Sequence, residues 1–327
     1  MLPLLQTLRS PSIPRRSPSS SVHRPTQQGD GAAIARPVGM VAIIGRPNVG
    51  KSTLVNALVG ERVSITSRKP QTTRDRVLGV RTDSDAQYIF VDTPGFQRRH
   101  RNALNLRMNE AVTGALKDVD AIVLVIESGG WNDADQQVLQ LLPVDSGNVI
   151  LAINKSDLLT ERDRLLPLMA ESMNRYKFRA IVPVSAEKSR QLDDLLREIR
   201  PMLPEGMLLF DEDQYTDRSA RFLAAESVRE KAYRLLGDEL PYGIAVTIDR
   251  WDESRATTQI AATLFVEREA HRPIVIGQDG AKLREISRLA RADIEQTLGT
   301  PVFLEVWVRV KRGWSDDARA MKSLGYG

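Results

Sequence analysis

The chain has 327 residues, of which 42% are hydrophobic and 27% are charged, and this length accommodates about two domains. It contains no cysteine, which excludes disulfide bonds, thiolate metal sites and cysteine nucleophiles. Its formal net charge of +4 is compatible with binding to nucleic acid or to an anionic membrane surface. No apolar run in the sequence approaches the roughly 18 residues that a membrane-spanning helix requires.

Residues 1–36 differ in composition from the rest of the chain. Prolines interrupt them, and arginines and serines precede the first acidic residue, Asp30. We interpret this stretch as a disordered tail, because it cannot bury enough apolar surface to order itself. The alternative is an organellar transit peptide, which is also rich in arginine and serine, although the prolines disfavour the amphipathic helix that such a peptide forms.

From Gly39 to about Leu203, short apolar runs alternate with stretches of helical periodicity. The runs predict strands at Met40–Ile44, Val77–Arg81, Tyr88–Val91, Ala121–Ile126, Val149–Ile153 and Ile181–Val184. The stretches between them predict helices at Lys51–Leu58, Leu104–Leu116, Asp135–Leu142, Asp163–Asn174 and Leu192–Leu203. This alternation predicts an α/β domain with a mostly parallel sheet and helices on both faces.

A second pattern follows Pro204 and an acidic link at Asp211–Asp213, and it predicts a smaller α+β domain. Its elements are expected at Arg218–Leu236 (helix), Gly243–Asp249 and Gln259–Glu267 (strands), Ala281–Leu298 (helix) and Val302–Val310 (strand). We therefore expect a tail at 1–36, a nucleotide-binding domain at 37–205, a linker at 206–217, a second domain at 218–314 and a C-terminal tail at 315–327.

The segment Gly45–Thr53 fits the phosphate-loop pattern G-x-x-x-x-G-K-[ST], and it follows a strand and opens a helix. Gly45 and Gly50 let backbone N–H groups turn toward phosphate oxygens, and the helix N-terminus adds partial positive charge. Lys51 is expected to reach the β and γ phosphates of a nucleoside triphosphate, and Ser52 to coordinate Mg²⁺. Thr53 completes the set of phosphate-side ligands.

Asp92-Thr-Pro-Gly95 follows the third predicted strand. A carboxylate at the end of such a strand can hold Mg²⁺, directly or through water. Gly95 is placed to donate its N–H to the γ phosphate. On its own this tetrapeptide is a common turn, but downstream of a phosphate loop it indicates a nucleotide switch.

Asn154-Lys155-Ser156-Asp157 follows the fifth predicted strand and predicts the base specificity. A carboxylate accepts hydrogen bonds from guanine N1–H and N2–H₂, a pair that adenine lacks, so Asp157 predicts GTP and GDP as ligands. Lys155 is expected to pack its stem along the base, and Asn154 to brace the loop. Backbone N–H groups at Ser185 and Ala186, after the last strand, are expected near the guanine oxygen.

The segment Thr66–Arg74 lies between the first helix and the second strand. A threonine hydroxyl there can complete the Mg²⁺ shell when the γ phosphate is present. Thr73 is the first choice and Thr72 the alternative, while a plain polar surface loop is the simpler interpretation of either residue.

Catalysis is expected to rest on Lys51, Thr73 and Asn48. Phe96 occupies the position where many GTPases carry a glutamine that orients water, so another group or ion must act. Asn48 could hold a monovalent cation such as K⁺ near the β–γ bridge, and otherwise it is a polar turn residue.

The segment Ile274–Ile286 combines an apolar run, a G-x-x-G loop and an amphipathic helix. A loop of this type in a KH domain clamps the backbone of a few nucleotides, and basic residues on the following helix supply charge. The RNA-binding residues are expected to be Gly277, Gln278, Asp279, Gly280, Lys282 and Arg284, with further charge from Arg288 and Arg291. The neighbouring apolar residues line a groove for bases or fill the core; they are Ile274, Ile276, Leu283 and Ile286. Trp307 and Trp314 could both stack on bases, but Trp307 alternates with apolar neighbours on its strand, which favours core packing for it.

Together these motifs resemble the Era family, bacterial Ras-like GTPases with a C-terminal type II KH domain. The segments that carry the resemblance are Gly45–Thr53, Ser67–Asp75, Asp92–Gly95, Asn154–Asp157, Ser185–Glu187, Thr216–Arg234, Asp238–Tyr242, Ile274–Leu298 and Val306–Tyr326. The resemblance implies GTP binding and slow GTP hydrolysis with Mg²⁺, and contact with small-subunit ribosomal RNA near its 3′ end. It also implies a role in small-subunit assembly and partial association with the cytoplasmic membrane face.

We therefore expect a monomeric cytoplasmic GTPase that acts as a switch on the precursor of the small ribosomal subunit, or an organellar one if the tail is a transit peptide. The alternative is an RNA-binding module whose nucleotide domain is regulatory but catalytically idle. Intact Lys51, Ser52, Asp92 and Asp157 argue against that alternative. A GTPase for RNA modification or membrane traffic is disfavoured by the KH-like domain.

Overall fold

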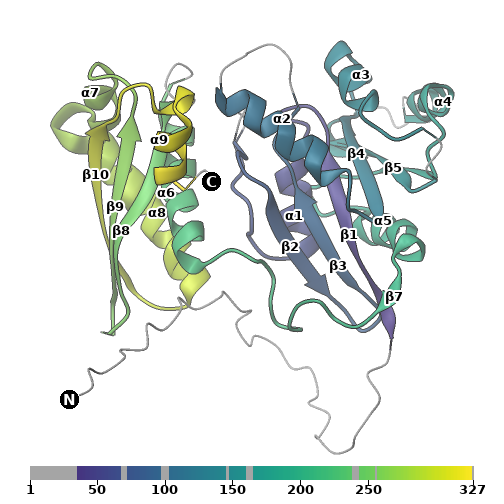
Figure 1. Ribbon diagram of the computed structural model, residues 1–327, viewed down its shortest axis with the longest axis horizontal. Helices are drawn as coiled ribbons and strands as arrows, with labels where there is room; N and C mark the ends of the chain where they lie inside the picture. The colour runs from purple at the N-terminus through teal and green to yellow at the C-terminus, as the bar shows by residue number, and fades with distance from the viewer. Residues whose placement is uncertain are drawn as a thin grey trace, which may run out of the picture.

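The computed structural model describes residues 35–67, 72–96, 103–144, 147–159, 165–237, 243–254 and 256–325. Residues 1–34 of the tail or transit peptide expected at the N-terminus therefore lie outside the described residues. The segment 238–242 lies outside them too. Figure 1 shows two domains side by side, with their β-sheets separated by helices.

The first domain is built on a sheet in which all neighbouring long strands are parallel except β2 and β3. The strand order is β2 (Val77–Thr82), β3 (Gln87–Asp92), β1 (Arg36–Ile44), β4 (Ala121–Glu127), β5 (Val149–Asn154) and β6 (Ala180–Pro183), and the short β7 (Glu205–Gly206) pairs with β1. Strands β3 and β5 are buried along their whole length, because helices cover both faces of the sheet.

Side chains of β1 alternate between two cores. Val41 and Ile43 pack with α1 (Lys51–Val59) and α5 (Leu192–Ile199) on one face. Ala42 and Ile44 pack with helices on the other face, which are α2 (Ala103–Ala115), α3 (Asp133–Leu139) and α4 (Leu165–Arg175). Full burial of each such branched side chain contributes about 1.5–3 kcal/mol. The mostly parallel, doubly covered sheet that the sequence predicts is confirmed.

The second domain has a three-stranded sheet with the order β10 (Val302–Val310), β9 (Thr258–Val266) and β8 (Ala245–Asp252). Strands β8 and β9, both expected from the sequence, form an antiparallel hairpin, and β10 runs parallel to β9. Helices α6 (Ala220–Leu235) and α8 (Ala281–Leu298) share one core with this sheet. This is the α+β arrangement expected for a KH-type domain.

Two short helices were not expected from the sequence. Helix α7 (His271–Ile276) occupies the apolar run before the G-x-x-G loop. Helix α9 (Ala318–Ser323) lies in the segment expected as a C-terminal tail, and Asp317 caps it by accepting from the N–H of Arg319 at 2.8 Å. Met321 of α9 is buried, so this end of the chain is packed rather than extended.

The favoured role of Trp307, core packing, and the stacking role of Trp314 were both wrong. Trp307 is 59% exposed, because its side of β10 faces away from the helices of the second domain. Trp314 is fully buried, and its indole N–H donates to the carbonyl of Gly243 at 3.2 Å. It cannot stack on a base from that position.

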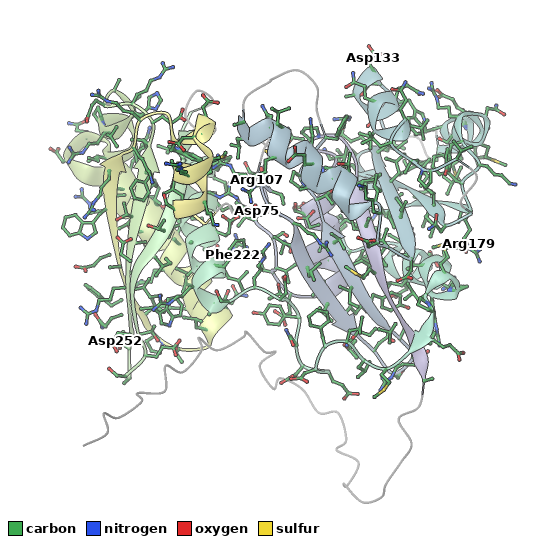
Figure 2. All side chains as sticks on the ribbon, viewed as in Figure 1. Asp75, Arg107, Asp133, Arg179, Phe222 and Asp252 are labelled. Atoms are coloured by element: carbon green, nitrogen blue, oxygen red, sulfur yellow. The ribbon has the colours of Figure 1, made fainter. Side chains whose placement is uncertain are left out.

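The two domains meet along α6, α9 and α2, and Figure 1 shows α6 and α9 on the side of the second domain that faces the first. Leu104 and Met108 of α2 share a small apolar core with Trp314 and Met321. Figure 2 places Asp75 and Arg107 at this junction, where their side chains form an ion pair at 3.6 Å.

The loop between α1 and β2 contacts α6 through polar groups. Glu230 is fully buried and accepts from the backbone N–H of Thr66 at 3.0 Å. Arg229 Nη2 donates to the carbonyl of Thr72 at 2.6 Å. These contacts fasten the loop to the second domain.

Arg74, from the same loop, is only 2% exposed because the second domain encloses it. Its Nη1 donates to the carbonyl of Ile244 at 2.6 Å, and its Nη2 donates to the hydroxyl of Tyr233. The guanidinium also lies 5.6 Å and 5.4 Å from the ring centroids of Tyr233 and Trp314.

Within the described residues, no helix is long and apolar enough to cross a bilayer.

Candidate nucleotide and nucleic-acid sites

The phosphate loop turns tightly between β1 and α1. Gly50 has φ 97°, and a Cβ there would lie 2.3 Å from Asn154 Nδ2, so only glycine fits. Lys51 begins α1, and its buried ammonium donates to the carbonyl of Arg46 at 3.0 Å. Its side chain therefore curls back over the loop, where phosphate oxygens would be its partners.

Burial lowers the pKa of Lys51 to about 8, although the Asp92 carboxylate opposes that shift. A desolvated ammonium gains most from an anion placed beside it, because burial disfavours its charged form when it stands alone. The loop therefore favours a phosphate ligand electrostatically as well as geometrically.

Three oxygen-bearing side chains meet beside the phosphate loop. Ser52 Oγ lies 2.7 Å from Thr73 Oγ1, and Thr73 Oγ1 donates to Asp92 Oδ2 at 3.4 Å. Asp92 is fully buried, burial raises its pKa above the usual value, and Oδ1 has no hydrogen-bond partner among the described residues. A buried carboxylate oxygen without a donor, next to two hydroxyls, fits the oxygen ligands that Mg²⁺ prefers.

The loop after β5 is tied to the phosphate loop. Asn154 Nδ2 donates to the carbonyl of Val49 at 2.8 Å, and Asn154 Oδ1 accepts from the N–H of Ala186 at 3.0 Å. Asp157 Oδ1 accepts from Ser185 Oγ at 2.5 Å. The asparagine therefore joins three loops, and a serine hydroxyl orients the carboxylate that was expected to contact the base.

One cavity of about 890 Å³ unites these groups. Most predicted nucleotide residues line it, namely Asn48, Gly50, Lys51, Ser52, Thr53, Thr73, Gly95, Asn154, Lys155, Asp157 and Ala186, together with Thr72. Gly45, Asp92 and Ser185 are buried next to these residues and do not line the cavity. The volume is within the range of roughly 300–1,000 Å³ that small-molecule and cofactor sites occupy.

Some residues of this site escaped prediction from sequence. Arg46 and Glu127 form an ion pair at 2.7 Å beside the phosphate loop. Arg234, from α6 of the second domain, lines the same cavity. Glu127 stands at the carboxyl end of an apolar strand, which is a signal that sequence reasoning could have used. Arg234 gives no such signal, because only the docking of the two domains brings it there.

The G-x-x-G loop lies between α7 and α8. Gly277 has φ 74°, and a Cβ there would lie 2.9 Å from Lys282 Cβ, so the loop needs glycine at this position. Lys282 and Arg284 are exposed on the first turn of α8, where Arg284 Nη1 donates to the carbonyl of Asp279 at 2.6 Å. The predicted residues therefore form one exposed basic corner.

The apolar residues around this loop divide between the two roles that the sequence left open. Ile286 is fully buried in the core of the second domain, whereas Ile274 is 43% exposed beside the loop. Ile276 and Leu283 are partly buried against the same core. Ile274 is thus the apolar side chain most available to a ligand.

Comparison with known proteins gives two matching family models. Residues 40–155 match a model described as "50S ribosome-binding GTPase", and residues 239–315 match a model described as "KH domain". GTPase Era from Bordetella avium is 54% identical over 288 residues, which are 88% of this chain and 97% of that protein. GTPase Era from Nitrosomonas eutropha is 50% identical over the same shares of the two chains.

Two solved structures are similar over both domains. One is Era in complex with MgGDPNP and nucleotides 1506–1542 of 16S ribosomal RNA, with a TM-score of 0.86 and 41% identity. The other is a variant of Aquifex aeolicus Era bound to GDP and AlF4⁻, with a TM-score of 0.85 and 41% identity. Each alignment covers 89% of this chain and 99% of the solved one.

Proposed function

Because the chain belongs to the Era family of GTPases, we propose that it binds GTP, hydrolyses it to GDP and phosphate, and binds small-subunit ribosomal RNA during assembly of the small ribosomal subunit. One observation carries the nucleotide part of this proposal. Lys51, Ser52 and Thr73 on one side and Asp157 on the other line a single cavity, as binding of one guanine nucleotide requires.

The residues that would contact phosphate and Mg²⁺, in the cavity and beside it, each have a proposed task. Lys51 would neutralise the β and γ phosphates, while Ser52, Thr73 and Asp92 would hold Mg²⁺, which would supply charge neutralisation on the transferred phosphoryl group. The uncompensated Oδ1 of Asp92 supports that assignment, as does the magnesium nucleotide bound to the solved relative. Phe96 is buried in the core of the first domain, so it takes no part in orienting water.

Substitution of Asp157 tests the base assignment. Asp157→Asn replaces one carboxylate oxygen, a hydrogen-bond acceptor, with an amide N–H₂, a donor. The asparagine side chain therefore cannot accept hydrogen bonds from both guanine N1–H and N2–H₂. We expect GTP affinity to fall by roughly 100-fold and xanthosine triphosphate to bind better than GTP. Equilibrium titration with fluorescent nucleotides measures both constants. Unchanged GTP affinity would remove the guanine assignment.

The RNA part of the proposal rests on the exposed corner at Gly277–Gly280, Lys282 and Arg284, and on the ribosomal RNA bound to the solved relative. In Gly280→Asp a side chain with negative charge enters a position with φ 77°. We expect RNA affinity to fall by tenfold or more with GTP affinity unchanged. Filter binding of a 3′-terminal small-subunit RNA fragment measures the change, and undiminished binding would eliminate the clamp.

A monovalent cation is also proposed for catalysis. Asn48 lines the cavity, and the residue directly after Gly95 is the buried Phe96 and not a glutamine, so hydrolysis must use another group or an ion. A cation held by Asn48 would neutralise charge at the β–γ bridge. GTP turnover should then be faster in K⁺ than in Na⁺ at equal ionic strength. Equal rates would remove the role of Asn48, and absence of turnover in both salts would favour the idle-domain alternative.

The remaining parts of the proposal come from the sequence and from its resemblance to the family. They are peripheral contact with the cytoplasmic membrane face, a cytoplasmic location and a monomeric state, with the nucleotide domain at 37–205 and the RNA-binding domain at 218–314. Flotation with anionic vesicles tests the membrane contact, and sedimentation equilibrium tests the monomer. An organellar location would follow only if residues 1–36 direct a fused reporter into an organelle.

A further inference from the structure

Glu127 stands at the carboxyl end of β4, between the phosphate loop and the loop that follows β5. Its two carboxylate oxygens contact different cations. Oε2 accepts from Arg46 Nη2 at 2.7 Å, and Oε1 forms an ion pair with Lys155 Nζ. Arg46 belongs to the phosphate loop and Lys155 to the base-side loop, so this one carboxylate bridges the two halves of the nucleotide site.

Each cation has a second partner that fixes its position. Arg46 Nε lies 3.1 Å from Asp135 Oδ1, and Asp135 is 1% exposed at the start of α3. Lys155 Nζ donates to the carbonyl of Asn48 at 2.9 Å. Lys155 is therefore held between a backbone carbonyl of the phosphate loop and the carboxylate that also binds that loop's arginine.

The cluster is partly shielded from water, which strengthens its ion pairs relative to fully exposed ones. The exposed fractions of the side chains are 17% for Arg46, 27% for Glu127 and 35% for Lys155. Glu127 itself is not among the described residues that line the cavity. Any effect of Glu127 on a nucleotide must therefore pass through the residues it holds.

We propose that Glu127 is a positioning residue for guanine nucleotide: it holds Lys155 where the base stacks and ties the base-side loop to the phosphate loop, and in this way it slows nucleotide release. The inference rests on the proposed function, because it requires a guanine nucleotide in the cavity. It deepens that function by assigning the rate of nucleotide exchange to a residue outside the recognised motifs.

The variant Glu127→Gln preserves shape but removes the charge that two cations share. We expect fluorescent GDP to leave the full-length protein about tenfold faster, equivalent to about 1.4 kcal/mol, and a GTP analogue to accelerate equally. At saturating GTP, kcat should stay within about twofold of the wild-type value while KM rises. Glu127→Asp keeps the charge but is one methylene shorter, so it should restore part of the retention.

Glu171→Gln is the matched control, because Glu171 pairs with Arg175 on the exposed face of α4 and should leave release unchanged. Release from Glu127→Gln within about twofold of wild type overturns the proposal. So does a lower unfolding temperature without nucleotide combined with unchanged release, since that result marks a structural role alone. If Glu127→Gln does not fold, release from Glu127→Asp decides by the same criterion. Wild-type protein that binds no GDP would instead defeat the proposed function.

Discussion

Arg74 offers a sharp test of how the two domains are joined. We consider Arg74→Met, which keeps much of the side-chain volume but removes the guanidinium. The carbonyl of Ile244 and the hydroxyl of Tyr233 would lose a charged donor in a buried setting, at about 1–3 kcal/mol each. The stacking of the guanidinium on two aromatic rings contributes roughly 1–2 kcal/mol more. Apolar contacts of methionine recover part of this loss, so we expect a net destabilisation of about 3 kcal/mol.

The assay is urea unfolding followed by the fluorescence of Trp314, which lies against the arginine, in a background where the other three tryptophans are replaced by phenylalanine. Small-angle scattering gives the separation of the domains in the same samples. Arg76→Met is the control, because Arg76 is exposed and only two positions away. A free energy of unfolding for Arg74→Met within about 0.5 kcal/mol of wild type, with unchanged domain separation, would refute the reasoning.

Two further predictions concern the same junction. Burial raises the pKa of Asp293, but hydrogen bonds from Lys231 and Arg62 outweigh it and leave the pKa below its usual value. Because the pKa of Asp293 is lower in the folded than in the unfolded protein, its charge stabilises the fold above the unfolded pKa of about 3.9, and this contribution is lost as pH falls through the folded pKa. Asp293→Asn should therefore be less stable than wild type near pH 7, and the difference should shrink as pH falls below about 4 in thermal unfolding. Trp314→Ala should lower the free energy of unfolding by about 3–5 kcal/mol, measured in urea, because it empties a fully buried site. Unchanged stability with weaker RNA binding would instead show Trp314 acting on bases.

Much of the nucleotide site was predictable because its residues follow strands of one parallel sheet. In such a sheet the carboxyl ends of the strands share one edge, so the order of Lys51, Asp92 and Asp157 along the chain is enough to place them together. Ser52 and Asp92 were predictable for the same reason, because Ser52 follows β1 and Asp92 ends β3. Thr73 instead precedes β2, and it reaches the same edge because β2 runs antiparallel to β3 with Val77 opposite Asp92.

The sequence could place Trp307 but not Trp314. Trp307 shares its face of β10 with the charged Glu305 and Arg309, while the valines and Leu304 occupy the other face, so the alternation of this strand places Trp307 outward and the expectation of core packing missed that signal. Trp314 follows the strand in a turn without periodicity. Its burial depends on α2 of the other domain, which no local pattern encodes.

The adjacent residues Thr73 and Arg74 also constrain how this protein could be rebuilt. The hydroxyl of one faces Ser52 and Asp92, while the guanidinium of the next is enclosed by Tyr233, Ile244 and Trp314. A chimera in which a foreign KH domain follows residue 217 would leave the buried guanidinium of Arg74 without these partners. A functional graft must therefore also carry Tyr233, Ile244 and Trp314. Substitutions at these three positions during evolution must be accompanied by compatible changes in the loop of the first domain that carries Arg74.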